Sequence, residues 1–145
     1  MVSLGLGQKP VVMSQYPHMM REDTDVWTKF LASGFGDIKR VWYDVHVGKP
    51  VEVEGDSGSV LGRISRGLTR KRIDCVATVA GGVWVIEVKP MASMYSIGQV
   101  LTYARLFRRE YISPGRVIPV IVCDSYDEDL LDAFDGLGVL VIVNG

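Results

Sequence analysis

Apolar residues along the chain recur at two different spacings, which predicts a protein built from both helices and strands. Val26, Phe30 and Leu31 follow helical spacing, so we expect a helix over residues 21–33. Residues 41–47 are β-branched and aromatic, which is typical of a strand. The first third of the chain therefore reads as a helix followed by a strand.

The middle of the chain is predicted to form a β-hairpin. Residues 72–79 and 83–88 are two apolar runs rich in β-branched side chains, and a glycine pair at 81–82 joins them. Glycines tolerate the positive φ angles of a tight two-residue turn, so we expect the turn at this pair, although a turn at 80–81 fits the same runs. Short strands around a turn are expected within residues 51–68.

The last third of the chain alternates helices and apolar strands. Pro90 is expected to end the second hairpin strand, and residues 93–111 follow with helical spacing. A buried strand is predicted over 117–122, a short helix over 127–134 and a final strand over 139–143. The order α-β-β-β-α-β-α-β predicts an α/β fold with a central mixed β-sheet flanked by helices.

Length and composition indicate one globular domain. The chain has 145 residues with 48% hydrophobic and 23% charged, and we expect an N-terminal arm at 1–18 followed by a single domain at 19–145. Cys75 and Cys123 lie in apolar runs, so we expect reduced core cysteines. The sequence offers neither a run of about 18 apolar residues nor a secretory signal. We therefore expect a cytoplasmic (intracellular) protein without a membrane partner.

Three charged side chains are predicted to meet on the hairpin. Strand side chains alternate between faces, so Glu87 and Lys89 share one face. A turn at 81–82 places Asp74 opposite Lys89, and a turn at 80–81 places it opposite Glu87, so both registers bring the three residues together. The other face is predicted to be an apolar core face made of Ile73, Cys75, Ala77, Val79, Trp84, Ile86 and Val88.

This grouping of charges is typical of a metal site. Partly buried charges cost several kcal/mol unless they are paired or bind an ion, and Lys89 can neutralise only one of the two carboxylates. Hard oxygen ligands suit Mg²⁺ or Mn²⁺, which can activate a bound water and neutralise charge on a phosphoryl oxygen. The alternative is a solvated salt bridge between Lys89 and either carboxylate.

The helix after the hairpin adds a second motif, because Gln99 and Tyr103 stand four residues apart and share one helix face. Together these residues resemble the PD-(D/E)XK nuclease superfamily, which includes archaeal Holliday-junction resolvases, restriction enzymes and RecB-like nuclease domains. The resemblance covers residues 70–107 well, and the α-β-β-β-α-β order more loosely. It departs at Ile73, where the family name has proline.

The resemblance implies a restriction-endonuclease-like core and a Mg²⁺- or Mn²⁺-dependent deoxyribonuclease that hydrolyses phosphodiester bonds. Asp74 and Glu87 would be its metal ligands and Lys89 its catalytic lysine. Gln99 and Tyr103 would match the Q-x-x-x-Y motif of the RecB-like branch and support the site or touch DNA.

The family often places a glutamate on its first helix, and the candidate here is Glu22. Asp23 and Asp25 compete with it, and all three equally suit the helix dipole. His18 and His46 are each either a ligand or base, or structural.

Basic residues crowd the segment that leads into Asp74. Beside a phosphodiester site they suit contacts with the DNA backbone, and without a partner they would form a solvated loop. These nucleic-acid-binding candidates are Arg63, Arg66, Arg70, Lys71 and Arg72. The competing function is a binding module of the same fold that does not cleave. A chain this short has little room for a specificity domain, so we expect a homodimer or weak sequence preference.

Overall fold

The computed structural model describes residues 1–50 and 70–145. The short strands predicted within residues 51–68 lie outside the described residues.

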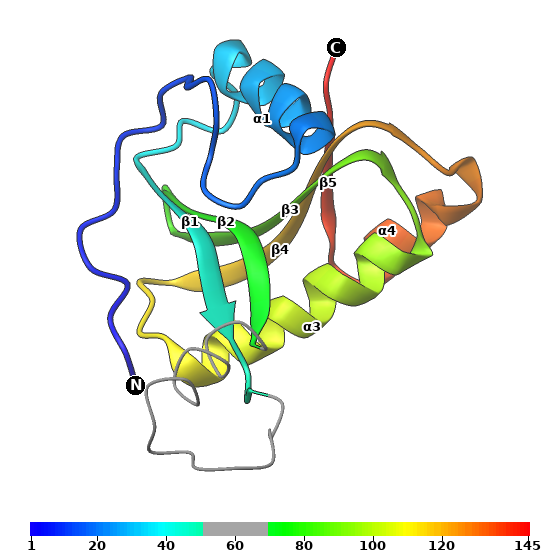
Figure 1. Ribbon diagram of the computed structural model, residues 1–145. Helices are drawn as coiled ribbons and strands as arrows, with labels where there is room; N and C mark the ends of the chain where they lie inside the picture. The colour runs from blue at the N-terminus through cyan, green and yellow to red at the C-terminus, as the bar shows by residue number, and fades with distance from the viewer. Residues whose placement is uncertain (51–69) are drawn as a thin grey trace, which may run out of the picture.

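A single five-stranded mixed sheet forms the centre of the protein (Figure 1). Its strands lie side by side in chain order, with antiparallel pairing from β1 to β3 and parallel pairing from β3 to β5. This arrangement confirms the α/β class with a mixed sheet. The strands are β1 (Arg40–Val47), β2 (Lys71–Val79), β3 (Gly82–Ala92), β4 (Arg116–Tyr126) and β5 (Leu140–Val143).

Helices cover both faces of the sheet (Figure 1). The apolar stripe of α1 (Arg21–Ser33) packs on one face through Trp27 and Phe30, as its spacing predicted. On the other face, α3 (Met94–Glu110) packs through Ala104 and Phe107. The remaining elements of the described residues are the short η1 (Glu128–Leu130) and α4 (Leu131–Gly136). No helix in the described ranges is both long and apolar enough to span a bilayer.

The N-terminal arm lies against this domain. Gln8 bridges to Val41 of β1, and Tyr16 is buried at 3% exposure, where its hydroxyl shares a 2.8 Å hydrogen bond with Thr28 of α1. The arm therefore contributes to the core, although residues 1–18 hold no helix or extended strand. Cys75 and Cys123 are free and buried, as expected.

The hairpin turn lies at residues 80–81, so its expected position at 81–82 is wrong. The strands pair Val79 with Gly82, which makes Gly82 the first residue of β3. A Cβ atom at Gly82 would lie 2.2 Å from the carbonyl oxygen of Arg116 on β4. Gly82 thus allows β3 and β4 to approach closely, whereas Gly81 adopts the positive φ angle (82°) that the turn needs.

Pro90 does not end β3, which continues to Ala92 and pairs Met91 with Ser125 of β4. The expectation was wrong because the pairing between β2 and β3 ends at Ile86. Beyond that residue, no described strand pairs with β3 on this side, and a proline is tolerated along such an edge.

Ile73 packs on the opposite side of the sheet from the one expected. Tyr43 and Cys75 form a cross-strand pair that packs with the α1 cluster, whereas the next pair but one, Val45 and Ile73, packs with the α3 cluster. Between them lies Asp44, which has a left-handed backbone (φ 53°). Simple alternation fails at this residue because its backbone leaves the extended conformation.

The two glycines Gly82 and Gly98 provide a matched test of this packing. Gly82→Ala should destabilise the protein by more than about 1 kcal/mol, since a new methyl group forces two strands apart. Gly98→Ala should stabilise it by up to about 1 kcal/mol, because a Cβ there meets nothing within 4 Å. Urea unfolding measures both changes. Equal shifts in the two variants would contradict the packing described for Gly82.

Candidate active site

The candidate site lies where β2 and β3 separate. Their last pair toward the open end of the hairpin is Cys75 with Ile86, and the next positions are Asp74 and Glu87. The backbone N–H of Val88 donates to Asp74 Oδ2 (2.9 Å), and the N–H of Asp74 lies 3.5 Å from Glu87 Oε1. Side-chain oxygens therefore replace the backbone partners that separating strands lose.

Burial of the two carboxyl groups dominates their electrostatics. Glu87 is 2% exposed, and its pKa lies well above the ordinary value because burial disfavours the charged form and Asp74 adds like charge. Burial likewise raises the pKa of Asp74, although the Val88 N–H and the charge of Lys89 act in the opposite direction. The pair is thus an acidic centre with too little positive charge around it.

The structure brings the three predicted hairpin residues together. On β3, Val85 packs with the cluster beneath α3, and alternation places Glu87 and Lys89 on the same face. Lys89 acts electrostatically on both carboxyl groups. Within the described ranges, however, Lys89 is not within 4 Å of an acidic oxygen. The arrangement is therefore not the solvated salt bridge considered as the alternative.

Gln99 and Tyr103 of α3 border this centre. The pKa of Tyr103 is raised by burial and by the negative charge of Glu87, while the Gln99 amide lowers it. Gln99 Oε1 is buried and has no hydrogen-bond partner among the residues that the structure describes. Tyr103 thus lies near the carboxyl pair, and Gln99, which hydrogen-bonds Tyr103, has an unsatisfied acceptor oxygen.

The acid of α1 that lies nearest the centre is Asp23 rather than Glu22. Glu22 is exposed, whereas the pKa of Asp23 is raised by burial, lowered by Lys89 and raised again by Asp74. Asp23 shares the buried helix stripe with Val26 and Trp27, at the i+3 and i+4 spacings. That stripe was readable in the sequence and would have identified Asp23.

The predicted basic surface is only partly placed. Arg63 and Arg66 lie outside the described residues. Arg70 is engaged within the protein, because its guanidinium bonds Glu110 and donates to the carbonyl of Gly48 (2.8 Å). We therefore remove Arg70 from the candidate DNA contacts.

Lys71 is exposed. Arg72 lies 3.7 Å from Asp44 Oδ1 and 3.1 Å from His18 Nδ1. These two residues remain candidates for contacts with DNA.

Asp44 is a neighbour of the site that sequence patterns did not reveal. The residues on either side of it, Tyr43 and Val45, pair with the two neighbours of Asp74 on β2, and the negative charge of Asp44 helps to raise the pKa of Asp74. The imidazoles of His18 and His46 approach Asp44 Oδ2 at 3.4 and 3.3 Å. The pairing of β1 with β2 and the left-handed backbone of Asp44 bring its carboxylate to the site. Neither feature can be recognised from the local sequence.

The chemistry of the centre fits a divalent cation. In the described part of the chain, no three or more His, Cys, Asp or Glu side chains form a metal-holding group, so Asp74 and Glu87 would be the only acidic ligands. Mg²⁺ commonly uses one or two carboxylates and keeps several waters. The buried, under-neutralised carboxyl pair suits such a hydrated ion.

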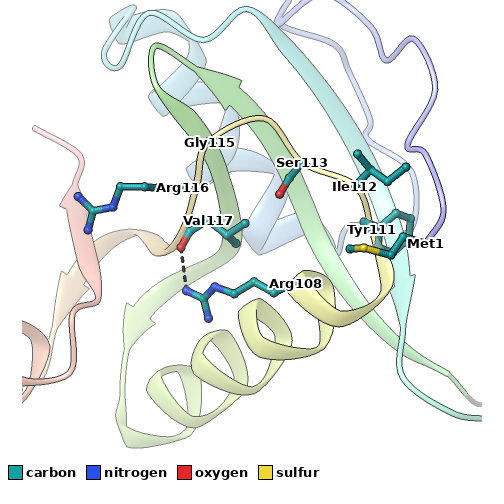
Figure 2. Close-up of a pocket in the computed structure, with 8 residues that line it drawn as sticks. All are labelled: Met1, Arg108, Tyr111, Ile112, Ser113, Gly115, Arg116 and Val117. Atoms are coloured by element: carbon teal, nitrogen blue, oxygen red, sulfur yellow. Dashed lines mark hydrogen bonds between the residues drawn. The ribbon is translucent and has the colours of Figure 1, made fainter.

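A hollow lies where α3 ends and β4 begins (Figure 2). It encloses about 550 Å³, and Arg108 Nη2 donates across it to the carbonyl of Val117 (2.8 Å). Of the described residues that line it, none is acidic and none belongs to the predicted catalytic set.

Comparisons with models of protein families, with curated proteins and with solved structures find no match to this chain.

The raised pKa values of Asp74 and Glu87 predict a pH-dependent stability. A carboxyl group with a raised folded-state pKa stabilises the fold below its unfolded value of about 4. That contribution is lost as pH rises through the folded value. Metal-free protein should therefore become less stable from about pH 4 to pH 8, and Glu87→Gln should flatten this slope and be the more stable protein at pH 8.

Thermal unfolding in EDTA across this pH range measures the effect. Glu128→Gln is the matched control, because Glu128 is exposed and lies on η1. Parallel pH profiles for wild type and Glu87→Gln would contradict the assignment.

Proposed function

We propose that this protein is a nuclease that hydrolyses phosphodiester bonds in DNA with Mg²⁺ or Mn²⁺. The observation that carries the proposal is the convergence of Asp74, Glu87 and Lys89 at the separation of β2 and β3. Two buried carboxyl groups and one ammonium group leave a negative excess that a cation would neutralise. A salt bridge with Lys89 would neutralise only one carboxylate, so it does not explain why both Asp74 and Glu87 are buried.

The fold gives further support. The described elements begin with a helix and a three-stranded antiparallel unit, and a helix then leads to a parallel strand. This order is compatible with the restriction-endonuclease-like core that the sequence resemblance implies. The proposal places the catalytic residues on the hairpin and their supporting residues on the two long helices.

Each residue has a distinct role in the proposed reaction. Asp74 and Glu87 would hold the cation, which when bound supplies charge neutralisation at the phosphate and a more acidic water. The Lys89 ammonium would orient the attacking water or stabilise negative charge on the phosphoryl oxygens. Tyr103 and Gln99 would fix the position of Glu87 from α3.

Asp23 is proposed to act through Lys89. The charge of Lys89 lowers the pKa of Asp23, so the two groups attract each other, and this attraction would hold the ammonium near the carboxyl pair. Asp23 is therefore a positioning residue in this scheme, and Glu22 has no role.

DNA is the proposed partner, with Lys71 and Arg72 as described candidates for backbone contacts. For a chain of 145 residues we propose either a homodimer or weak sequence preference. The alternative function is a binding module that keeps the fold without cleaving. It is favoured by the lack of a third acidic or imidazole ligand in the described ranges.

Cleavage assays on single-stranded, duplex and branched DNA with Mg²⁺, Mn²⁺ or EDTA separate these functions. Glu87→Gln and Lys89→Ala should each lower the cleavage rate by about 100-fold or more, which is typical of lost acid–base or electrostatic catalysis. Lys39→Ala, a change at an exposed lysine outside the site, is the control. Unchanged cleavage in both site variants, with folding intact, would sink the nuclease proposal.

The two neighbouring acids of α1 offer an internal comparison. Asp23→Asn should reduce cleavage by about tenfold, the lower end of effects seen when support for a metal site is removed. Glu22→Gln should stay within about twofold of wild type, because its side chain is exposed. Steady-state rates at one Mg²⁺ concentration are sufficient. A larger loss in Glu22→Gln would reverse our assignment of the helix acid.

A further inference from the structure

The hollow between the end of α3 and the start of β4 adjoins a second one of about 330 Å³. Arg108, Arg116 and Val117 line both, and we call the two hollows together the α3–β4 groove. Figure 2 shows Arg108 reaching from α3 to the Val117 carbonyl, whereas the Arg116 side chain extends from β4 in the direction away from Ile112. The groove therefore has a guanidinium group from each of the two elements that border it.

Positive charge is concentrated around this groove. Residues 105–116 contain four arginines and a single acid, Glu110, and the Glu110 carboxylate is bonded to Arg70. All four arginines are exposed, and none lies within 4 Å of an acidic oxygen among the residues that the structure describes: Arg105, Arg108, Arg109 and Arg116. The described part of the chain thus leaves the positive charge of the groove without a close partner.

The helix dipole accounts for only part of this charge. Cations in the last turn of a helix interact favourably with its C-terminal carbonyls, which suits Arg108 and Arg109. Arg116 belongs to a strand and gains nothing from the dipole. Arg108 directs one N–H group to β4, and a guanidinium has five, so this bond leaves most of them available. Guanidinium groups bind phosphate through pairs of parallel N–H groups, which a lysine cannot supply.

The groove is separate from the carboxyl pair. Arg116 pairs with Gly82 and Ile121 pairs with Glu87, so the two levels are five positions apart along β3. At about 3.3 Å per residue this separation is about 16 Å. Around α3, Arg108 stands about 140° from Tyr103, because each helical residue turns by about 100°. A phosphate in the groove is therefore not the cleaved one. Along one strand of a duplex, it would lie at least about five phosphates away.

We propose that the α3–β4 groove is a second phosphate-binding site, which holds the nucleic-acid backbone beyond the cleaved bond. This inference rests on the proposed function and adds an anchor for its substrate. Arg108 and Arg116 would each contact a phosphate oxygen, and neither would touch the reacting atoms. The groove would read no base sequence, since phosphate contacts position a nucleic acid without distinguishing its bases.

The salt dependence of binding tests this site. Each lost phosphate contact on duplex DNA makes the slope of log Kobs against log salt concentration less steep by about 0.9. Fluorescence anisotropy in EDTA measures Kobs for a labelled duplex over a series of NaCl concentrations. The carboxyl pair holds no cation under these conditions and does not attract phosphate. The double variant Arg108→Gln with Arg116→Gln should therefore have a slope less steep by about 1.8.

Two control variants separate phosphate contact from net charge. Lys9→Gln with Lys39→Gln removes the same charge from two exposed positions outside the groove and should keep the wild-type slope. Arg108→Lys with Arg116→Lys keeps the charge and should retain most of the slope. If the glutamine double variant fails to fold, Arg116→Gln alone replaces it, because this exposed side chain forms no ion pair with the described residues. The expected change is then about 0.9.

The outcomes distinguish this site from the function on which it rests. Cleavage by the wild type, with equal salt slopes in the wild type and the glutamine double variant, would overturn the second phosphate site alone. A less steep slope in that variant, with no cleavage by the wild type in Mg²⁺ or Mn²⁺, would support the phosphate site and reject the nuclease.

Three other results would overturn the inference. The first is an equal change of slope in the lysine control, and the second is no duplex binding by the wild type at low salt. The third is tight binding of inorganic phosphate that the glutamine double variant loses while its duplex binding is unchanged, which would assign the groove to a small anion.

Discussion

The separation of β2 from β3 after the Cys75–Ile86 pair is the constraint on which the site depends. If the ladder continued, the backbone N–H and C=O groups of β2 and β3 would bond to each other, and no space would separate the two strands. Because the ladder stops, the Val88 N–H is satisfied by the carboxylate of Asp74, which fixes that side chain beside Glu87. The same separation leaves two acids in a poorly solvated place, and their repulsion makes the gap receptive to positive charge.

Features that depend on local periodicity could be predicted from the sequence. The bounds of α1 follow from its apolar stripe, and the meeting of Asp74, Glu87 and Lys89 follows from side-chain alternation. The grouping of these three residues does not depend on the position of the turn, because turns at 81–82 and at 80–81 both bring them together. The same helical reasoning, applied to the first turn of α1, would also have selected Asp23 over Glu22.

Features that depend on distant parts of the chain could not be predicted in this way. The glycine pair predicts a turn at Gly82, but the role of this residue depends on the Arg116 carbonyl, which lies 34 positions away on β4. The switch of Ile73 to the other face arises at Asp44 on a neighbouring strand. In each case, tertiary contacts override a local pattern.

Pro90 has a consequence for how copies of this protein meet one another. An unpaired stretch of strand can recruit a strand from another molecule, which is a common route to aggregation. The stretch of β3 beyond Ile86 is unpaired by any described strand on one side, and Pro90 lacks an N–H group there. A strand from another molecule that paired here would therefore find no backbone N–H donor at Pro90, close to the carboxyl pair. Pro90 thereby disfavours the pairing of a second copy of the chain with this part of β3.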